Sequence, residues 1–200
     1  MIVNLLLLLV FIAVVLVLTR EGLWSGLVML LNILAATTFA TAWYEKLAAL
    51  ADGQMPSFTY LIDFLCLWGL FAVLLLLMRL ATDRVSRTKV KFLRQVELVG
   101  APLVAVVAGW IMVCFAAASL HTAPVPRSLV QAEPESRSMF FGLAPDRKWL
   151  AWVRYSTKDG PFAHSPASAV VFDNEADFIL RYADRRLKLE QAEGLRVNAN

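Results

Sequence analysis

Few residues in this 200-residue sequence are of types that could do chemistry. Cys66 and Cys114 each lie in an apolar run without a Cys or His at a ligand-like spacing, which is typical of small buried side chains. His121 and His164 are far apart in sequence and have no companion ligands nearby. The sequence also contains no GxSxG motif, no phosphate-binding loop and no paired carboxylates on one predicted helix face. We therefore expect no catalytic residue, no metal site and no cofactor, and a protein that is not an enzyme.

Two polar residues inside apolar stretches are candidates for a role within a membrane. Asn32 is flanked by Leu31 and Ile33, where an unsatisfied amide costs several kcal/mol. We expect it to hydrogen-bond another helix, with a polar transport path as the alternative. Asp63 lies about a turn and a half into an apolar stretch, and an ionisable group at such a position is a functional candidate by default. The interpretation that we favour is that Asp63 reaches water at the nearby membrane surface.

The elements that position these residues are predicted to be membrane-spanning helices. The chain is 59% hydrophobic and 18% charged, which is far more apolar than a soluble domain. A bilayer core of about 30 Å requires about 20 mostly apolar residues in a helix. Four stretches meet that requirement, residues 1–18, 22–43, 58–78 and 96–120. The first lacks a preceding basic residue and a following small-x-small pattern, so we expect a span and not a signal peptide. The predicted fold class is an all-α membrane protein with a four-helix transmembrane domain over residues 1–120.

Basic residues predict the orientation of these spans. Arg20 lies in the turn after the first span, and six more surround the third loop: Arg79, Arg84, Arg87, Lys89, Lys91 and Arg94. Positively charged loops between spans stay in the cytoplasm. This predicts that the N-terminus and the C-terminal tail lie on the outer face of the membrane, which in a bacterium with two membranes is the periplasmic side. It also predicts no nucleic-acid partner. Glu21, beside Arg20, is at the start of the next helix and gains from its dipole, so both residues are assigned to the turn and the topology.

Small residues at regular spacing predict how the spans pack. Gly22 and Gly26 form a GxxxG pair, and Gly100 and Gly109 lie among several alanines in the fourth span. Small side chains let helices approach closely in lipid. We expect helix contacts at these four glycines, with a smooth pore wall as the alternative.

The remaining chain is predicted to leave the membrane. Residues 121–138 contain three prolines among polar residues and are predicted to be an extended linker. Residues 139–200 are predicted to be a small soluble region, either α+β or partly ordered, in which Trp149–Tyr155 and Ser168–Phe172 could form a hairpin with a turn at Lys158–Pro161. Asp173 or Asn174 is predicted to cap a final helix.

This final helix carries a cluster of positive charge. The cluster is predicted to be a solvated face, with a lipid-headgroup patch as the alternative, and consists of Arg181, Arg185, Arg186 and Lys188. About sixty residues are few for an independent core. The tail is therefore expected to need the membrane surface, a second copy or a partner.

Two short motifs carry a family resemblance. Thr19-Arg20-Glu21-Gly22-Leu23 opens the second span, and Val96-Glu97-Leu98-Val99-Gly100 opens the fourth after the basic loop. In these motifs the chain resembles the CvpA family, the colicin V production proteins, which are bacterial inner-membrane proteins with about four spans. The resemblance covers roughly residues 1–120 and leaves the tail outside. Val104 stands where a second family glycine is expected, which bears on the packing of the fourth span.

The resemblance implies a role in colicin V production or in a wider envelope process, and it carries over no catalytic residue. We therefore expect a membrane scaffold or accessory factor for toxin production, secretion or envelope maintenance. Its predicted partners are the lipid bilayer and either further copies of the chain or envelope and secretion proteins. The alternative is a subunit of a channel or small-solute transporter, although a conducting path normally needs more intramembrane polarity than Asn32, the threonines near it and Asp63 provide.

Overall fold

The computed structural model of the chain describes residues 2–53, 59–85, 90, 92–131, 133, 136–160 and 171–191. Its helices are α1 (Ile2–Glu21), α2 (Leu23–Asp52), α3 (Thr59–Val85), α4 (Arg94–Thr122), α5 (Arg127–Val130), α6 (Pro145–Lys158) and α7 (Phe178–Gln191). Within the described ranges, four helices are long and apolar enough to cross a membrane, namely α1 to α4. The prediction of an all-α membrane protein with four spans is confirmed.

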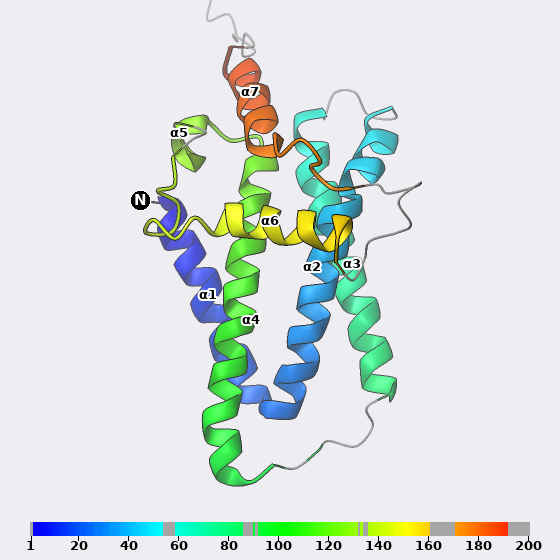
Figure 1. The fold of residues 1–200 in the computed structure, drawn as a ribbon, viewed down its shortest axis with the longest axis vertical. Coiled ribbons are helices and arrows are strands. Elements are labelled where there is room, and N and C mark those ends of the chain that lie inside the picture. The colour runs from blue at the N-terminus through cyan, green and yellow to red at the C-terminus, as the bar shows by residue number, and fades with distance from the viewer. Residues whose placement is uncertain are drawn as a thin grey trace, which may run out of the picture.

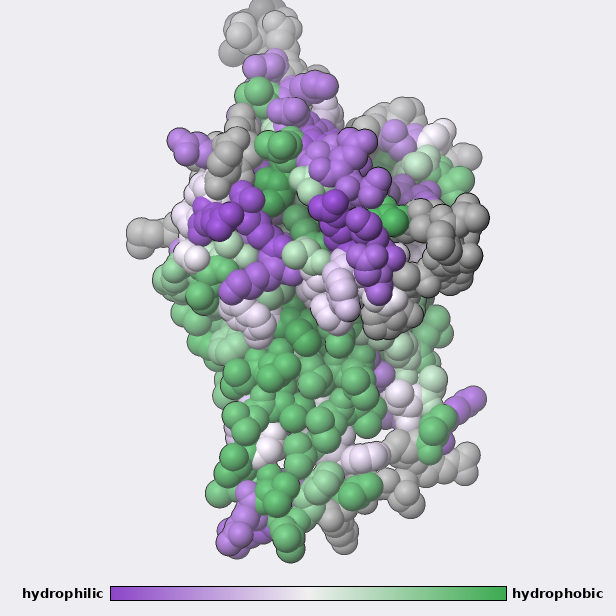
Figure 2. Space-filling model, viewed as in Figure 1, coloured by the Kyte–Doolittle hydropathy of each residue, from purple (hydrophilic) through white to green (hydrophobic). Residues whose placement is uncertain are grey.

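The central span is α4. It packs against α1 on one side and α2 on the other, and α2 in turn packs against α3 (Figure 1). The turn between α1 and α2 lies at the opposite end of the bundle from α7, and we call the two ends the Gly22 end and the α7 end. Apolar residues cover the lower part of the face in Figure 2, while hydrophilic residues gather over its upper part, around α6 and α7.

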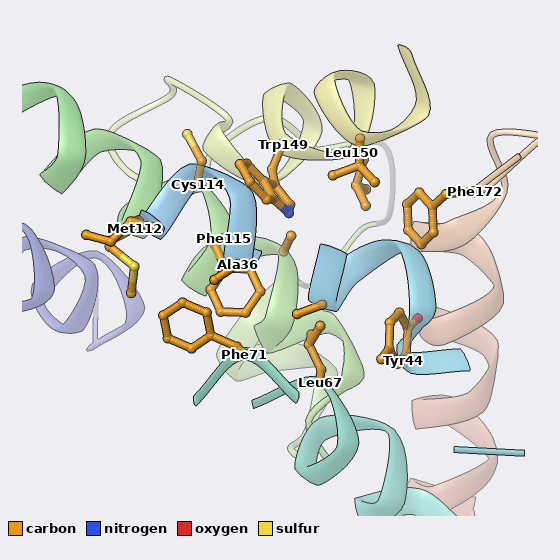
Figure 3. Packing of buried hydrophobic residues seen from close by; sticks show 14 of the residues in the cluster. Ala36, Tyr44, Leu67, Phe71, Met112, Cys114, Phe115, Trp149, Leu150 and Phe172 are labelled. Atoms are coloured by element: carbon orange, nitrogen blue, oxygen red, sulfur yellow. The ribbon is translucent and has the colours of Figure 1, made fainter. Parts of the chain in front are cut away.

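The helix α6 crosses the bundle instead of running along it (Figure 1). Its apolar side contributes Trp149, Leu150 and Val153 to the main core. The Trp149 ring meets Phe115 of α4 edge to face, with ring centroids 6.0 Å apart (Figure 3). Burying such a side chain contributes roughly 1.5–3 kcal/mol. The crossing helix is therefore part of the bundle core and not a separate soluble element.

Two indole hydrogen bonds fix the position of α6 on α2. Trp149 Nε1 donates to Thr41 Oγ1 at 3.0 Å, and Trp152 Nε1 donates to Thr38 Oγ1 at 3.1 Å. Each threonine hydroxyl donates to a carbonyl of its own helix, so its oxygen can accept. Thr38 and Thr41, two of the threonines that follow Asn32, thus bind the tail.

The expected β structure of the tail is not found in the described residues. Trp149–Tyr155 belongs to α6, because its large side chains bury one side of a helix against α2 and α4. Val171 and Phe172, the end of the predicted strand, lie in irregular structure, and residues 161–170 lie outside the described ranges. The predicted linker also differs, since α4 continues to Thr122 and residues 127–130 form α5.

The loop before α6 returns to the start of α1. Phe140 N donates to Asn4 Oδ1 at 2.9 Å, and the Phe140 ring lies 6.0 Å from the Trp110 ring of α4. Phe140, Phe141 and Ala144 adopt positive φ angles, which the tight return before Pro145 imposes. The loop therefore contacts both α1 and α4.

Candidate functional site: polar clusters at the two ends of the bundle

Asp63 of α3 is the centre of a polar cluster at the α7 end. Its Oδ2 accepts a hydrogen bond of 2.8 Å from the Tyr182 hydroxyl and forms an ion pair with Arg185. Because Tyr182 uses its proton on Asp63, its oxygen accepts from Tyr44 of α2, 2.9 Å away. Asp63 is only 8% exposed. The aspartate is therefore paired with the tail instead of being hydrated at the membrane surface.

The electrostatics of this cluster keep Tyr182 neutral. Burial raises the pKa of the Tyr182 hydroxyl, and the Asp63 carboxylate raises it further. The phenol thus stays protonated and continues to donate to Asp63. The Arg185 guanidinium lies 5.6 Å from the Tyr60 ring centroid, and Arg181 pairs with Glu45 at 3.0 Å. Together these contacts join α7 to α2 and α3.

A second cluster at the same end joins α4, α6 and α7. His121 Nε2 lies 3.0 Å from Asp146 Oδ2, and Arg186 Nη2 lies 3.4 Å from His121 Nδ1. A guanidinium can only donate, so Nδ1 accepts, and the imidazole is neutral with its proton on Nε2, donated to Asp146. All three side chains are buried. Arg186 also donates to the His121 carbonyl oxygen at 3.3 Å, which satisfies an orphan acceptor at the end of α4.

These clusters correct two expectations drawn from the sequence. Arg186 is buried and Arg185 is bound to Asp63, so the basic residues of α7 do not form one solvated face. His121 does have a carboxylate neighbour, Asp146, but that residue follows it by 25 positions and is supplied by another helix. No group of three or more His, Cys, Asp or Glu side chains that could hold a metal ion occurs among the described residues. Cys114 is buried and Cys66 half-buried, both as free thiols.

The two family-like motifs meet at the Gly22 end. Gly22 has a φ of +86°, and a Cβ there would lie 2.7 Å from Glu97 Oε1. A Cβ on Gly100 would lie 2.9 Å from Leu23 Cδ2. Each motif therefore supplies a glycine that makes room for a side chain of the other. The joint between the start of α2 and the start of α4 depends on both glycines.

The other two glycines also occupy helix contacts. A Cβ on Gly109 would meet Val15 and Phe11 of α1 at 3.0 and 3.1 Å. A Cβ on Gly26 would meet Val104 Cγ1 at 3.5 Å. Val104, where a family glycine was expected, thus packs against Gly26 of the neighbouring helix, so the small residue of this pair lies on α2.

A polar cavity of about 450 Å³ lies between α1, α2 and α3 at the Gly22 end. Arg20, Glu21 and Asn32 line it, together with residues of α3. Asn32 Nδ2 donates to Thr82 Oγ1 of α3 at 3.0 Å, which is the interhelical hydrogen bond expected for this amide. Arg79 lies 3.4 Å from Glu21 and 3.9 Å from Asp83. Four of the residues named from the sequence, Arg20, Glu21, Asn32 and Arg79, therefore line one cavity.

The structure does not bring Asn32 and Asp63 together. Asn32 lies at the Gly22-end cavity, whereas Asp63 lies in the α7-end cluster. The core between them is filled by apolar and aromatic side chains, among them Ile33, Ala36, Leu67, Phe71, Met112 and Phe115 (Figure 3). Within the described part of the chain, the two polar ends are separated by a packed core.

The sequence did not predict that residues of the tail bind the spans. Tyr182, Arg185 and Arg186 bind spans more than sixty positions earlier, so their partners had no local signature. One signal for α6 was present. Trp149 and Val153 are four positions apart and Pro145 precedes them, as in an amphipathic helix with proline in its first turn.

The geometry defines a class, a multi-pass membrane protein whose C-terminal helices are bound to its spans by buried polar contacts. The sequence matches the family model of the colicin V production protein over residues 3–146, and the chain belongs to this family. The resemblance is thereby confirmed, but its expected limit near residue 120 is wrong, since the match includes α5 and the start of α6. No curated protein and no solved structure matches the chain.

Proposed function

We propose that the chain is an inner-membrane accessory or scaffold protein of the colicin V production type, that it acts in toxin production or secretion or in envelope maintenance, and that it is not an enzyme. The observation that carries this proposal is the attachment of α7 to three spans through Asp63, Tyr44 and His121. These buried contacts hold a charged helix in a fixed position at one end of the bundle. A fixed polar surface is suited to binding a partner protein.

The proposed orientation places the α7 end in the periplasm. Arg20, Arg79, Arg84 and Arg94 all belong to helix ends at the Gly22 end. Positive charge near the ends of spans favours the cytoplasmic side. The surface formed by α6 and α7 would then face periplasmic or envelope proteins, while the Gly22 end would face the cytoplasm.

A channel or small-solute transporter subunit is the second candidate, and the cavity at the Gly22 end favours it. The packed core beyond Asn32 speaks against a path within one copy of the chain, because conduction requires continuous hydration or polar groups. Several copies could still build a path between them. The two candidates therefore differ in what the purified protein should contain and do.

Affinity purification of the full chain in mild detergent, with identification and quantification of bound proteins, tests the proposal. We expect an envelope or secretion protein at a fixed stoichiometry. Asp63→Asn should reduce this recovery because it weakens the attachment of α7. Arg84→Gln, which changes an exposed residue in the last turn of α3 at the opposite end of the bundle, provides the control. Recovery of the chain alone, as an oligomer that gives ion or solute flux in liposomes, would overturn the scaffold proposal in favour of the channel.

A further inference from the structure

Two arginines that differ in their partners line the cavity at the Gly22 end. Arg20 lines the cavity and forms no ion pair with any residue that the structure describes. Arg79 differs, since its guanidinium lies between Glu21 and Asp83 and is neutralised by them. Arg20 is therefore the group in this cavity that can bind an anionic ligand.

The cavity also contains the amide group of Asn32, whose oxygen can accept a hydrogen bond. The Thr82 hydroxyl donates to the carbonyl oxygen of Met78 at 2.8 Å, so its oxygen can only accept from Asn32. This requirement directs the Asn32 NH₂ group toward Thr82 and leaves Oδ1 without a hydrogen bond from the described residues. Asn32 is 3% exposed and lines the cavity. Because Asn32 lines the cavity, its Oδ1 atom can accept a hydrogen bond from a ligand that carries an N–H group.

The charges around the cavity select between ligand types. Arg20 and Arg79 contribute two positive charges, and Glu21 and Asp83 contribute two negative charges. A purely anionic ligand would be attracted by Arg20 but repelled by the two carboxylates. A purely cationic ligand would be attracted by the carboxylates but repelled by Arg20. A zwitterion can place its anion at Arg20 and its N–H donors at Asn32 and Glu21.

The surroundings of the cavity indicate where such a zwitterion comes from. Val17 of α1 and Leu80 of α3, each close in sequence to a cavity arginine, are 58% and 55% exposed. Apolar side chains exposed on membrane spans contact lipid, and indole rings such as that of Trp24, which also lines the cavity, favour the headgroup level. The cavity thus lies beside lipid at the height of the headgroups.

From these observations we propose that the Gly22-end cavity binds a phosphate-ammonium zwitterion, supplied as the phosphoethanolamine headgroup of a membrane lipid. Arg20 pairs with the phosphate, and Asn32 Oδ1 accepts from the ammonium group. The cavity volume of about 450 Å³ is within the range of small-molecule sites. This site does not depend on the proposed scaffold function.

Native mass spectrometry of the full chain in detergent tests the site by titration with two lipids of identical acyl chains. We expect phosphatidylethanolamine to bind more tightly than phosphatidylglycerol, which has the phosphate but no ammonium group. Arg20→Gln should weaken binding of both lipids about tenfold, equivalent to about 1.4 kcal/mol. Arg84→Gln, a charge change in the exposed last turn of α3 and outside the cavity, should leave both affinities unchanged. Equal binding of the two lipids, or equal effects of the two arginine changes, would overturn the proposal.

A second pair of variants separates ligand recognition from stability. Asn32→Leu should abolish the preference for phosphatidylethanolamine, because it removes the acceptor in the cavity. Thr82→Val breaks the same interhelical hydrogen bond but keeps Asn32 Oδ1, so the preference should persist. If both variants lost the preference equally, the acceptor role of Asn32 would be wrong. Soluble O-phosphoethanolamine serves as the third ligand, and binding as tight as that of the lipid would overturn the assignment to a membrane headgroup.

Discussion

At the scale of single residues, Gly22 is a position where the backbone conformation favours glycine. Its φ of +86° disfavours any side chain, and a Cβ would lie 2.7 Å from Glu97 Oε1. We expect Gly22→Ala to lower the free energy of unfolding by roughly 1–3 kcal/mol, the cost of a strained backbone at one position. Thermal unfolding in detergent measures this change.

Gly26→Ala is the matched control for Gly22→Ala. The added methyl group would meet Val104 at 3.5 Å, an ordinary van der Waals distance, within a regular helix. Its stability should therefore stay close to that of the original chain. Equal losses in the two variants would contradict the assigned role of the left-handed turn.

Replacing Asn32 is expected to lower the stability of the protein by a small amount. Asn32→Leu removes the hydrogen bond to Thr82 of α3. Interhelical hydrogen bonds in membranes contribute about 0.6 kcal/mol on average and about 1.7 at most. We expect a loss of stability in this range, and a double-mutant cycle with Thr82→Val should give a coupling energy of similar size. A cycle with no coupling would show that the bond does not contribute.

Predictions for single residues succeeded where they did not require knowing which residue would be the partner. An amide among apolar neighbours must bind another helix, so the hydrogen bond of Asn32 could be expected without knowing its acceptor. Asp63 is different, since burial by the tail depends on Tyr182 and Arg185, which are 119 and 122 positions away. No local pattern around Asp63 distinguishes a carboxylate paired with such residues from one that reaches water.

At the scale of elements, the attachment of α7 depends on Asp63. Asp63→Asn keeps the shape of the side chain but removes the charge that binds Arg185, and hydrogen bonds to charged groups contribute about 1.5–3 kcal/mol. We expect faster hydrogen exchange in α7, with little change in α1. Hydrogen-exchange mass spectrometry of the purified chain measures both.

Glu45→Gln is the comparison for this experiment. It removes the α2 carboxylate that pairs with Arg181 of α7, but both side chains of that pair are more than a third exposed. Exposed ion pairs contribute at most about 1 kcal/mol. Exchange in α7 should therefore change much less than in Asp63→Asn. A larger change in Glu45→Gln than in Asp63→Asn would show that α7 is attached mainly through the exposed ion pair between Arg181 and Glu45.

The four spans and α6 illustrate what hydropathy can predict for an element. Each span holds an apolar run long enough for a membrane helix, so the four helices could be predicted from the sequence. Their ends were less accurate, since α2 extends to Asp52, beyond the predicted end at Trp43. The 14 residues of α6 contain aromatic and charged residues that suit either a strand or an amphipathic helix. The helix is favoured because Trp149 and Val153 pack into one core with side chains of α2 and α4. That core exists only in the folded bundle.

At the scale of the whole molecule, the orientation is open to a direct test. Basic residues at the Gly22 end predict that the C-terminal residues are periplasmic. A fusion after Asn200 should therefore be active with alkaline phosphatase and inactive with a fluorescent protein that matures only in the cytoplasm. The same two reporters after Asp52, on the other side of α2 from Gly22, should behave alike, because α2 also ends at the α7 end. Fluorescence after Asn200 would show that the basic loop had been misinterpreted.

The position of α6 along α2 has a consequence for the surrounding bilayer. Its contact at Thr38 is 15 residues beyond Leu23, about 22 Å at 1.5 Å per residue, whereas α1 provides 20 residues, about 30 Å. Lys148 and Lys158 are exposed on α6, so lipid headgroups must approach it. The hydrocarbon layer is therefore expected to be thinner beside α6 than beside α1. Such hydrophobic mismatch costs fractions of a kcal/mol per Å. Thermal stability of the protein should therefore be higher in short-chain than in long-chain bilayers. The lipids that surround the protein should also be enriched in short acyl chains on the side of α6.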